Sequence, residues 1–141
     1  MSWDNTRAVA DAVHQHLSPT NPAGSFLITG YKDDNTLTVL ESGTGGVEVL
    51  KERLAEDKVL YILLRITDIK DGNALYRDVL LSWWGPKVSK IKAARMRTHH
   101  SLVFDTLRPN HSQLEVLGKR EFTEQIIRDR SSPGSGSHVI E

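Results

Sequence analysis

Two apolar segments near the middle of the chain constrain its fold more than any other feature. Residues 59–66 are almost continuously apolar, and residues 79–84 repeat that pattern. Such runs are typical of strands that are covered on both faces. The loop between them contains Asp71-Gly72-Asn73, which favours a tight antiparallel connection with a residue at positive φ. The sequence therefore predicts two central strands of a sheet between helices, with Trp83 and Trp84 on opposite faces.

The rest of the chain divides into helical and extended segments. Asp4 or Asn5 is a suitable N-cap for an amphipathic first helix. A later helix rich in basic residues is expected to stop before Pro109, because the residue ahead of a proline avoids the helical region. The pattern around Asp33-Asp34-Asn35 is that of a β-hairpin. The expected helices cover residues 3–17, 47–55, 87 or 88–107 and 120–128, and the remaining strands cover residues 25–31, 36–40 and 113–117.

These elements predict a single α/β (α+β) domain. With 141 residues, of which 38% are apolar, the chain is about one domain long and can bury a core. We expect a mixed central β-sheet of five or six strands, sandwiched between helices, over residues 1–130. Residues 131–137 read Ser-Ser-Pro-Gly-Ser-Gly-Ser, a composition too polar and flexible to pack. Residues 131–141 are therefore expected to form a disordered C-terminal tail.

Composition excludes several classes of function. The chain has no cysteine, so it has no disulfide, no thiolate metal ligand and no cysteine nucleophile. Its 18 Lys and Arg residues balance 18 Asp and Glu residues, so no net field draws it to nucleic acid. The longest apolar run is far shorter than a membrane-spanning helix. We therefore expect a cytoplasmic protein with no membrane span and no nucleic-acid partner.

The sequence also lacks a convincing catalytic or metal-binding constellation. On a helix His14 and His16 would point away from each other, and His99 and His100 are adjacent, so neither pair forms a ready metal site. All four histidines are predicted to lie at the surface. Residues 43–46 lack the Gly-Lys-Ser/Thr ending of a P-loop, and no serine lies in a Gly-x-Ser-x-Gly elbow. We therefore predict no enzyme activity, no cofactor and no metal.

Local charge asymmetry is the main indication of a binding partner. Residues 87–100 include five Lys or Arg residues and two His residues without a single acid. On one continuous helix, Lys87, Lys90 and Arg97 would fall within an arc of roughly 80° and form a cationic ridge. Such a ridge would favour an acidic partner and make binding salt-dependent. The alternative is that the charged stripe is merely the solvated face of an amphipathic helix.

Two strings of residues are shared with a known family. Residues 61–67 read Tyr-Ile-Leu-Leu-Arg-Ile-Thr, and residues 79–88 read Val-Leu-Leu-Ser-Trp-Trp-Gly-Pro-Lys-Val. They resemble the coactosin branch of the ADF homology (actin-depolymerising-factor) domain, in which an apolar strand ends in Arg-aromatic-Thr and the next closes in Trp-apolar-Gly before a Val opens the long helix. The element order over residues 3–130 is also that of this domain. Two departures are Pro86, where coactosins usually have Glu, and Arg95-Met96, which is closer to the Lys-Met of ADF and cofilin.

The resemblance implies an actin-binding protein of the cytoskeleton. It implies binding to the side of filamentous actin, with monomeric actin as a further partner, and modulation of filament stability or capping without severing. Arg77 occupies the position of the basic residue on which filament binding depends in coactosins. Lys70 and Arg128 would extend the same edge, and Met96 could add an apolar contact. The implied actin-binding residues are therefore Lys70, Arg77, Lys87, Lys90, Arg95, Met96, Arg97 and Arg128.

Several alternatives stay open at this point. Arg95-Met96 keeps open a cofilin-like factor that severs or depolymerises filaments. A scaffold or chaperone module on the same fold would bind a partner other than actin. Each basic residue also fits plain surface solubility, and Met96 equally fits a buried filler. Ser2 invites comparison with the serine whose phosphorylation blocks actin binding in ADF and cofilin, a switch that coactosins generally lack. We expect a monomer.

Overall fold

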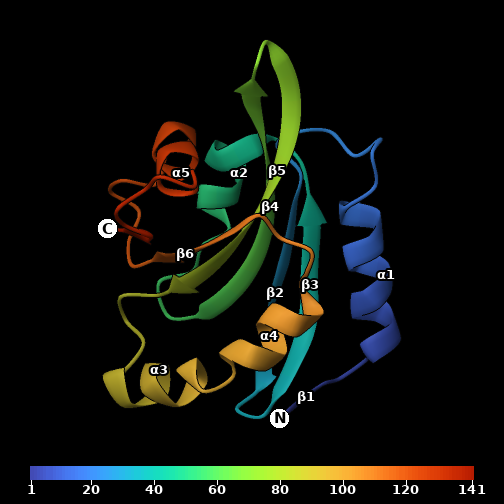
Figure 1. Ribbon diagram of the computed structural model, residues 1–141. Coiled ribbons are helices and arrows are strands. Elements are labelled where there is room, and N and C mark those ends of the chain that lie inside the picture. The colour runs from blue at the N-terminus through green and yellow to red at the C-terminus, as the bar shows by residue number, and fades with distance from the viewer.

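A mixed β-sheet with helices on both faces forms the centre of the molecule (Figure 1). The computed structural model describes residues 1–141, apart from the side chain of Lys70. Within that part the sheet has seven strands, in the spatial order β1 (Ser2–Trp3), β3 (Thr36–Gly43), β2 (Phe26–Asp33), β4 (Val59–Lys70), β5 (Asn73–Trp84), β6 (Ser112–Val116) and β7 (Val139–Ile140). The predicted fold class is confirmed. The two-residue strands β1 and β7 at the sheet edges were not predicted.

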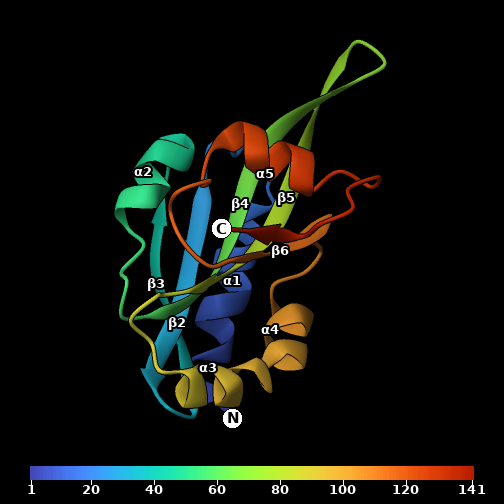
Figure 2. The same ribbon diagram turned by 90° about the vertical axis from the view of Figure 1, so that its left-hand side faces the viewer.

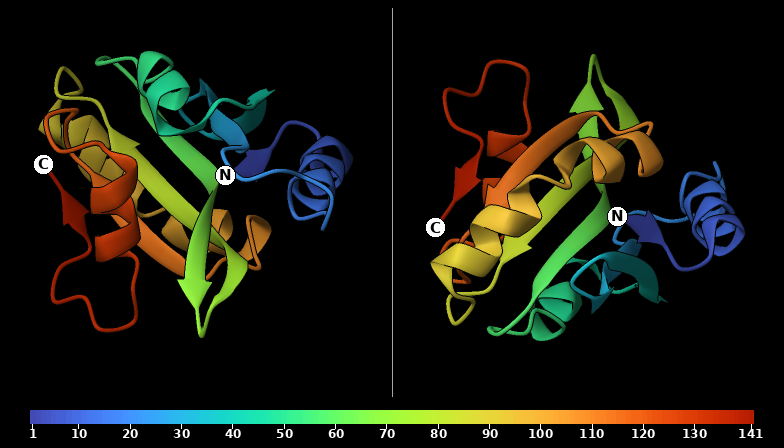
Figure 3. Two further views of the ribbon diagram at one scale, coloured as in Figure 1. Left: turned by 90° about the horizontal axis from the view of Figure 1, so that it is seen from above. Right: turned by 90° about the horizontal axis from the view of Figure 1, so that it is seen from below.

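The five helices of the described chain divide between the two faces of the sheet (Figures 2 and 3). They are α1 (Thr6–His16), α2 (Gly46–Glu52), α3 (Lys90–Arg97), α4 (His100–Thr106) and α5 (Glu124–Arg130). One apolar core joins the sheet to α2 and α5, and a second joins it to α1, α3 and α4. The central strand β4 serves both cores, because Ile62 and Leu64 face the first while Tyr61 and Leu63 face the second.

The two adjacent tryptophans pack as predicted. Trp83 is fully buried in the core beneath α2 and α5, and Trp84 lies in the core beneath α1, α3 and α4. The glycine that follows them allows a close backbone approach. A Cβ at Gly85 would lie 2.2 Å from the carbonyl oxygen of Glu56, a separation that real Cβ atoms do not reach. The Trp-Trp-Gly string therefore ends in glycine because any side chain there would collide with the loop before β4.

The hairpin of β4 and β5 projects from the sheet as a two-stranded arm. β2 pairs with β4 only as far as Leu64, and β6 pairs with β5 only from Val79, so residues 66–77 pair only with each other. This arm stands above the body of the molecule in Figure 1. Its tip is the predicted tight turn, with Asp71 at φ 54° and Gly72 at φ 80°. We call residues 66–77 the β4–β5 arm.

The expected long helix from residue 87 or 88 to 107 is two helices, α3 and α4. The first begins later than predicted because Ser89 is its N-cap and accepts a hydrogen bond from the Lys92 N–H at 3.1 Å. It ends at Arg97, where the Thr98 hydroxyl donates to the Arg95 carbonyl at 2.6 Å. The break turns His99 inward, where its side chain is buried.

The expectation of a disordered tail over residues 131–141 is corrected for the last residues. Val139 and Ile140 form β7, which pairs in parallel with β6 at Glu115 and Val116. The Ile140 side chain is fully buried in the core beneath α2 and α5. One large apolar side chain thus fixes the end of a segment whose Ser and Gly residues gave no reason to expect order.

Candidate protein-binding surface

The residues predicted to bind a partner fall into two groups at opposite ends of the molecule. Arg77 lies at the base of the β4–β5 arm and Arg128 lies on α5, and both elements are at the top of Figures 1 and 2. Lys70 belongs to the same arm, but its side chain lies outside the part of the chain that the structure describes. The second group, Lys87, Lys90, Arg95, Met96 and Arg97, belongs to α3 and the turn before it, at the bottom of the same views.

Arg77 connects the arm to the end of α5. Its guanidinium pairs with the Asp68 carboxylate across the arm and donates to the Arg128 carbonyl at 3.1 Å and to the Ser131 hydroxyl at 2.9 Å. Only 12% of its side chain is exposed. Most of the hydrogen-bonding capacity of Arg77 is therefore used within the protein, so its first effect is to hold the arm against α5.

Arg128 makes a second connection between α5 and the arm. Its Nε donates to the Thr67 carbonyl at 3.0 Å, and its guanidinium pairs with Glu124 one turn earlier at 3.1 Å. About 29% of its side chain remains exposed. Beyond these two arginines the arm exposes apolar side chains, with Ile69 at 75%, Leu75 at 50% and Tyr76 at 44%. The described side chains of the arm therefore offer an exposed apolar surface, a feature that charge counting along the sequence missed.

The cations around α3 do not form the single ridge that was predicted. Lys87 lies in the turn before the helix, where it is within 3.4 Å of Glu56. Lys90 is exposed and has no ion-pair partner among the described residues. Arg95 is 60% exposed and only loosely paired, 3.9 Å from Asp34. Lys90 and Arg95 are thus the cations of this group most available to a partner.

Arg97 and Met96 point toward the sheet. The Arg97 guanidinium lies 4.2 Å above the centre of the Trp84 ring and pairs with Glu115 on β6. Met96 is only 3% exposed and belongs to the core beneath α3. Met96 is therefore a buried filler in this structure, the alternative that the sequence left open, and its side chain is not exposed for contact with a partner.

A buried polar network that was not predicted connects α1 to the centre of the sheet. Both carboxylate oxygens of Asp78 accept hydrogen bonds from Arg65, at 3.0 and 2.9 Å, and one also contacts the His16 ring at 3.1 Å. Arg65 further donates to the carbonyls of Ser18 and Asn21 in the loop after α1. All three charged or titratable side chains are buried, so the surface position expected for His16 is wrong.

Asp78 stays ionised in this network. Burial alone would raise the pKa of Asp78, but the hydrogen bonds and charges of His16 and Arg65 outweigh it and hold the pKa below its ordinary value. Three of the roughly four lone-pair positions of this carboxylate are occupied, and the side chain is only 4% exposed, so it is not accessible to a substrate. We therefore interpret Arg65, Asp78 and His16 as a structural network.

A second buried network fixes the break between α3 and α4. The Tyr31 hydroxyl lies 2.8 Å from the Tyr61 hydroxyl and 2.8 Å from Nδ1 of His99. Burial lowers the pKa of His99, and burial together with the hydrogen bond to Tyr61 raises the pKa of Tyr31. The surface position predicted for His99 is wrong as well, because the helix break that buries it leaves no trace in the apolar periodicity. His14, His100 and Ser2 are exposed.

The described part of the chain contains neither a membrane-spanning helix nor a cluster of metal ligands. None of its helices has the length and apolar character needed to cross a bilayer. No three His, Cys, Asp or Glu side chains among the described residues are grouped so that they could hold a metal ion. The exposed features described above, the β4–β5 arm with α5 and the exposed side of α3, are the candidate contact surfaces.

Comparison with known proteins identifies the family. The sequence profile of the cofilin/tropomyosin-type actin-binding proteins matches residues 4–132. The chain belongs to this family. The match covers both cores except for Trp3 and Ile140, and it includes the β4–β5 arm, α3 and α5 but ends before β7. The resemblance that residues 61–67 and 79–88 indicated is therefore confirmed.

Relatives of this family member are found by sequence and by structure. The chain is 25% identical over 134 residues to the drebrin-like protein of Mus musculus, and this covers 95% of the chain but only 30% of that longer protein. The human coactosin-like protein superposes with a TM-score of 0.82 at 17% identity, covering 93% of this chain and 97% of that one. Mouse coactosin, described as an actin filament binding protein, gives a TM-score of 0.76 at 18% identity, covering 97% and 94%. At these identities the structural matches show a shared fold.

Proposed function

We propose that this chain is an actin-binding protein of the coactosin type that binds the side of filamentous actin. The observation that carries the proposal is the family match over residues 4–132. The chain would modulate filament stability or capping without severing, as a monomer, in the cytoplasm and on the actin cytoskeleton. It would act by contact alone, without catalysis, cofactor or metal. The likeness of its fold to mouse coactosin, an actin filament binding protein, supports the filament as the partner.

The proposed contact surface has two parts. The β4–β5 arm would contribute Lys70 and its exposed apolar side chains, while Arg77 and Arg128 hold it at a fixed angle to α5. The helix α3 and its first turn would contribute Lys87, Lys90 and Arg95, with Arg97 beside them. Actin filaments are acidic, so the cations would speed and orient docking, and the apolar arm would slow dissociation.

The test is co-sedimentation with actin filaments at low and at physiological salt. The sharpest variant is Lys90→Glu with Arg95→Glu, because both side chains are exposed and little used within the fold. We expect at least about tenfold weaker binding, which corresponds to about 1.4 kcal/mol. The matched control is Arg7→Glu on α1, an exposed cation outside both parts of the proposed contact surface, which should leave binding unchanged.

Arg77→Glu tests a different part of the surface and needs a stability control. The substitution removes the pair with Asp68 and two hydrogen bonds to the end of α5, so it loosens the arm as well as reversing a charge. Loss of binding with unchanged unfolding would place Arg77 in the contact itself. Loss of both would assign it to positioning the arm.

Co-sedimentation and microscopy together also distinguish side binding from the alternative functions. Filaments that stay long in the microscope while the chain pellets with them support side binding, and shortened filaments support a cofilin-like severing factor. The exposure of Arg95 favours the severing factor, because Arg95 is the exposed member of the Arg95-Met96 pair that resembles the Lys-Met of ADF and cofilin. No pelleting at either salt would reject both and favour a scaffold or chaperone role on the same fold.

A further inference from the structure

The β4–β5 arm has no neighbouring strand to fix its angle to the body of the molecule. Residues 66–77 pair only with each other, so the arm stands free of the sheet in Figure 1. From Asn73 near the tip to Arg77 at the base, β5 advances about 3.3 Å per residue, or roughly 13 Å. A tilt of about 10° at the base would therefore move the tip by roughly 2 Å. Side-chain contacts at the base thus decide where the arm stands.

The two faces of the arm are held by different contacts. On the α5 side, Arg77 and Arg128 bond the arm to the helix. On the α1 side, the ring of Tyr76 lies over the guanidinium of Arg65, with 4.7 Å between Cζ and the ring centre. Tyr76 is two residues from Asp78, the direct partner of Arg65 in the β4–β5 pairing. Ring and guanidinium are therefore diagonal neighbours on one face of the ribbon.

The guanidinium beneath Tyr76 is itself held by the body of the molecule. Two nitrogens of Arg65 donate to the Asp78 carboxylate at 3.0 and 2.9 Å. The third nitrogen donates to the Ser18 carbonyl at 2.6 Å and to the Asn21 carbonyl at 3.1 Å. These bonds use four of the five N–H donors of the guanidinium. The Arg65 side chain, only 4% exposed, thus presents a fixed cationic face to the ring.

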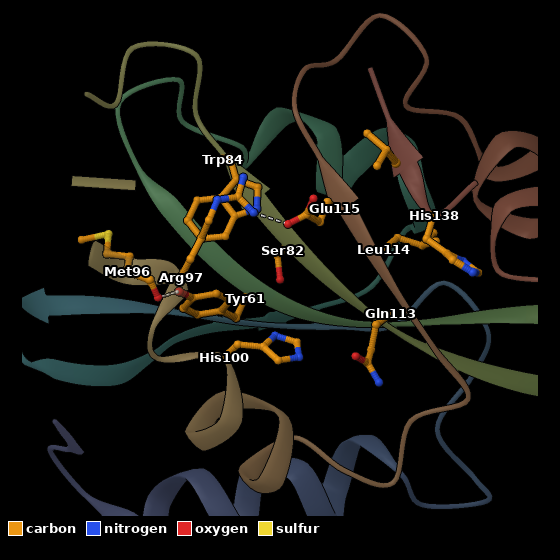
Figure 4. Close-up of a pocket in the computed structure, with 11 residues that line it drawn as sticks. Tyr61, Ser82, Trp84, Met96, Arg97, His100, Gln113, Leu114, Glu115 and His138 are labelled. Atoms are coloured by element: carbon orange, nitrogen blue, oxygen red, sulfur yellow. Dashed lines mark hydrogen bonds and ion pairs between the residues drawn. The ribbon is translucent and has the colours of Figure 1, made fainter. Parts of the chain in front are cut away.

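A second guanidinium–ring contact in the described chain has the opposite arrangement. In Figure 4, Arg97 lies over Trp84 at 4.2 Å and pairs with Glu115. There the ring is buried and the arginine side chain is 46% exposed, so an exposed arginine rests on a fixed ring. At the arm the arginine is buried, and the 44% exposed ring of Tyr76 belongs to the projecting element. The contact between Arg65 and Tyr76 therefore restrains the arm.

We propose that Tyr76 is a positioning residue whose ring, stacked on Arg65, fixes the β4–β5 arm at the angle at which it meets its partner. The identity of that partner rests on the proposed actin binding, whereas the fixed arm does not depend on it. The network of Arg65, Asp78 and His16 thereby gains a role beyond stability, because it holds the surface on which the ring rests. Contacts on both faces pre-organise the arm and lower the cost of ordering it on binding.

The first measurement is the backbone order of the arm, from ¹⁵N relaxation of the whole chain without actin. Tyr76→Ala is compared with Leu75→Ala, which removes an exposed apolar side chain from the other face of the same strand. We expect order parameters of the arm strands near about 0.85 in the native chain and in Leu75→Ala, and below about 0.6 in Tyr76→Ala. Tyr76→Phe keeps the ring and should restore the native order.

Arg65→Lys separates positioning from direct contact with a partner. Arg65 is too buried to touch a partner, and Lys keeps a positive charge beside Asp78 while removing the flat guanidinium. We expect this variant to loosen the arm as Tyr76→Ala does, and the double variant to be no looser than either single one. Urea unfolding shows whether Arg65→Lys still folds. If it does not, Tyr76→Ala and Tyr76→Phe carry the comparison, because Tyr76 lies at the surface.

Co-sedimentation with actin filaments then connects the order of the arm to binding. We expect Tyr76→Ala to bind about tenfold more weakly than the native chain, because several residues must then be ordered on binding. Tyr76→Phe should bind within about twofold of the native chain, with the ring and its contact retained.

Three results would overturn the proposal. The first is a native order of the arm in Tyr76→Ala, because the ring would then not hold it. The second is a loosened arm in Tyr76→Ala that binds filaments as tightly as the native chain, a result that leaves actin binding intact. The third is no binding by the native chain, which rejects actin as the partner and with it this role of Tyr76, whatever the order of the arm.

Discussion

Replacing Asp78 by Asn should destabilise the fold far more than any single surface ion pair would. The carboxylate of Asp78 accepts two hydrogen bonds from Arg65 and one contact from His16, and the Asp78 and Arg65 side chains are each only 4% exposed. Removing one partner of a buried pair leaves the other charge uncompensated, which costs roughly 3–5 kcal/mol. We expect about 3 kcal/mol, because the amide oxygen of Asn still accepts one of the bonds.

The measurement is urea unfolding followed by circular dichroism. With an m-value of roughly 2 kcal/mol per molar urea, a loss of about 3 kcal/mol lowers the midpoint by about 1.5 M. The matched control is Glu41→Gln, which breaks the Arg53–Glu41 pair at 2.9 Å, whose side chains are 42% and 39% exposed. That variant should lose at most about 1 kcal/mol. Equal midpoints for the two variants would refute the buried-pair argument.

The pH dependence of the folding stability gives an independent check of the Asp78 carboxylate. The partners of Asp78 hold its pKa in the folded protein below its ordinary value, so its contribution is fully present above about pH 4. The contribution is lost as the pH falls through the lowered value, because Asp78 is then protonated in both states. The stability difference between the native chain and Asp78→Asn should therefore narrow below about pH 4. A difference that stays constant down to pH 2 would contradict this assignment.

Three further predictions concern the glycine after β5, the end of the chain and the helix break. Gly85→Ala should cost about 1–3 kcal/mol in urea unfolding, because its Cβ would overlap the carbonyl of Glu56; an unchanged midpoint would contradict this. Ile140→Ala should cost about 2–4 kcal/mol and expose residues 131–141 to protease, whereas equal cleavage of both chains would show that β7 is not held by this side chain. As the pH falls below about 6.5 the native chain should lose stability, because burial lowers the pKa of His99 and the unfolded chain therefore binds the proton more readily. His99→Gln should reduce that loss, and identical profiles of stability against pH for the two chains would refute this role of His99.

The parts of the fold that depend on apolar periodicity were predictable from the sequence. The continuous apolar runs of residues 59–66 and 79–84 specify strands buried on both faces, and β4 and β5 are those strands. Asn5 as N-cap of α1 and the turn at Asp33 to Asn35 follow from local side-chain hydrogen bonds, which the structure contains at 2.9 and 3.0 Å. Local rules therefore determined these elements.

The features that were not predictable depend on contacts between distant residues. The break at Thr98 and His99 occurs because the hydroxyl of Tyr31, on β2, hydrogen-bonds with the His99 ring. β7 forms because Ile140 fills a gap in the core, which a Ser- and Gly-rich context conceals. The sequence does not show whether a polar residue will be buried together with a partner far along the chain. Arg65 lies 13 positions and His16 62 positions from Asp78, and all three are buried together.

Only part of the candidate surface was predictable, because the rest also depends on contacts between distant residues. Counting charges along the chain found the cations of α3, but it could not show that Arg97 turns to Glu115 and Trp84 or that Arg77 is used to hold the arm. It also missed Ile69, Leu75 and Tyr76, because their exposure depends on the arm extending beyond the sheet. Partner strands, and not composition, decide which apolar residues are left at the surface.

The most direct test of the central claim is to image single actin filaments by fluorescence microscopy while the labelled chain is added at physiological salt. The account predicts that the chain decorates the sides of filaments, that decoration decreases as salt is raised, and that filament length is preserved. Absence of decoration at any concentration that saturates coactosin in parallel would contradict actin binding by this family member. Decoration followed by fragmentation would retain actin binding and contradict the coactosin-type, non-severing mode.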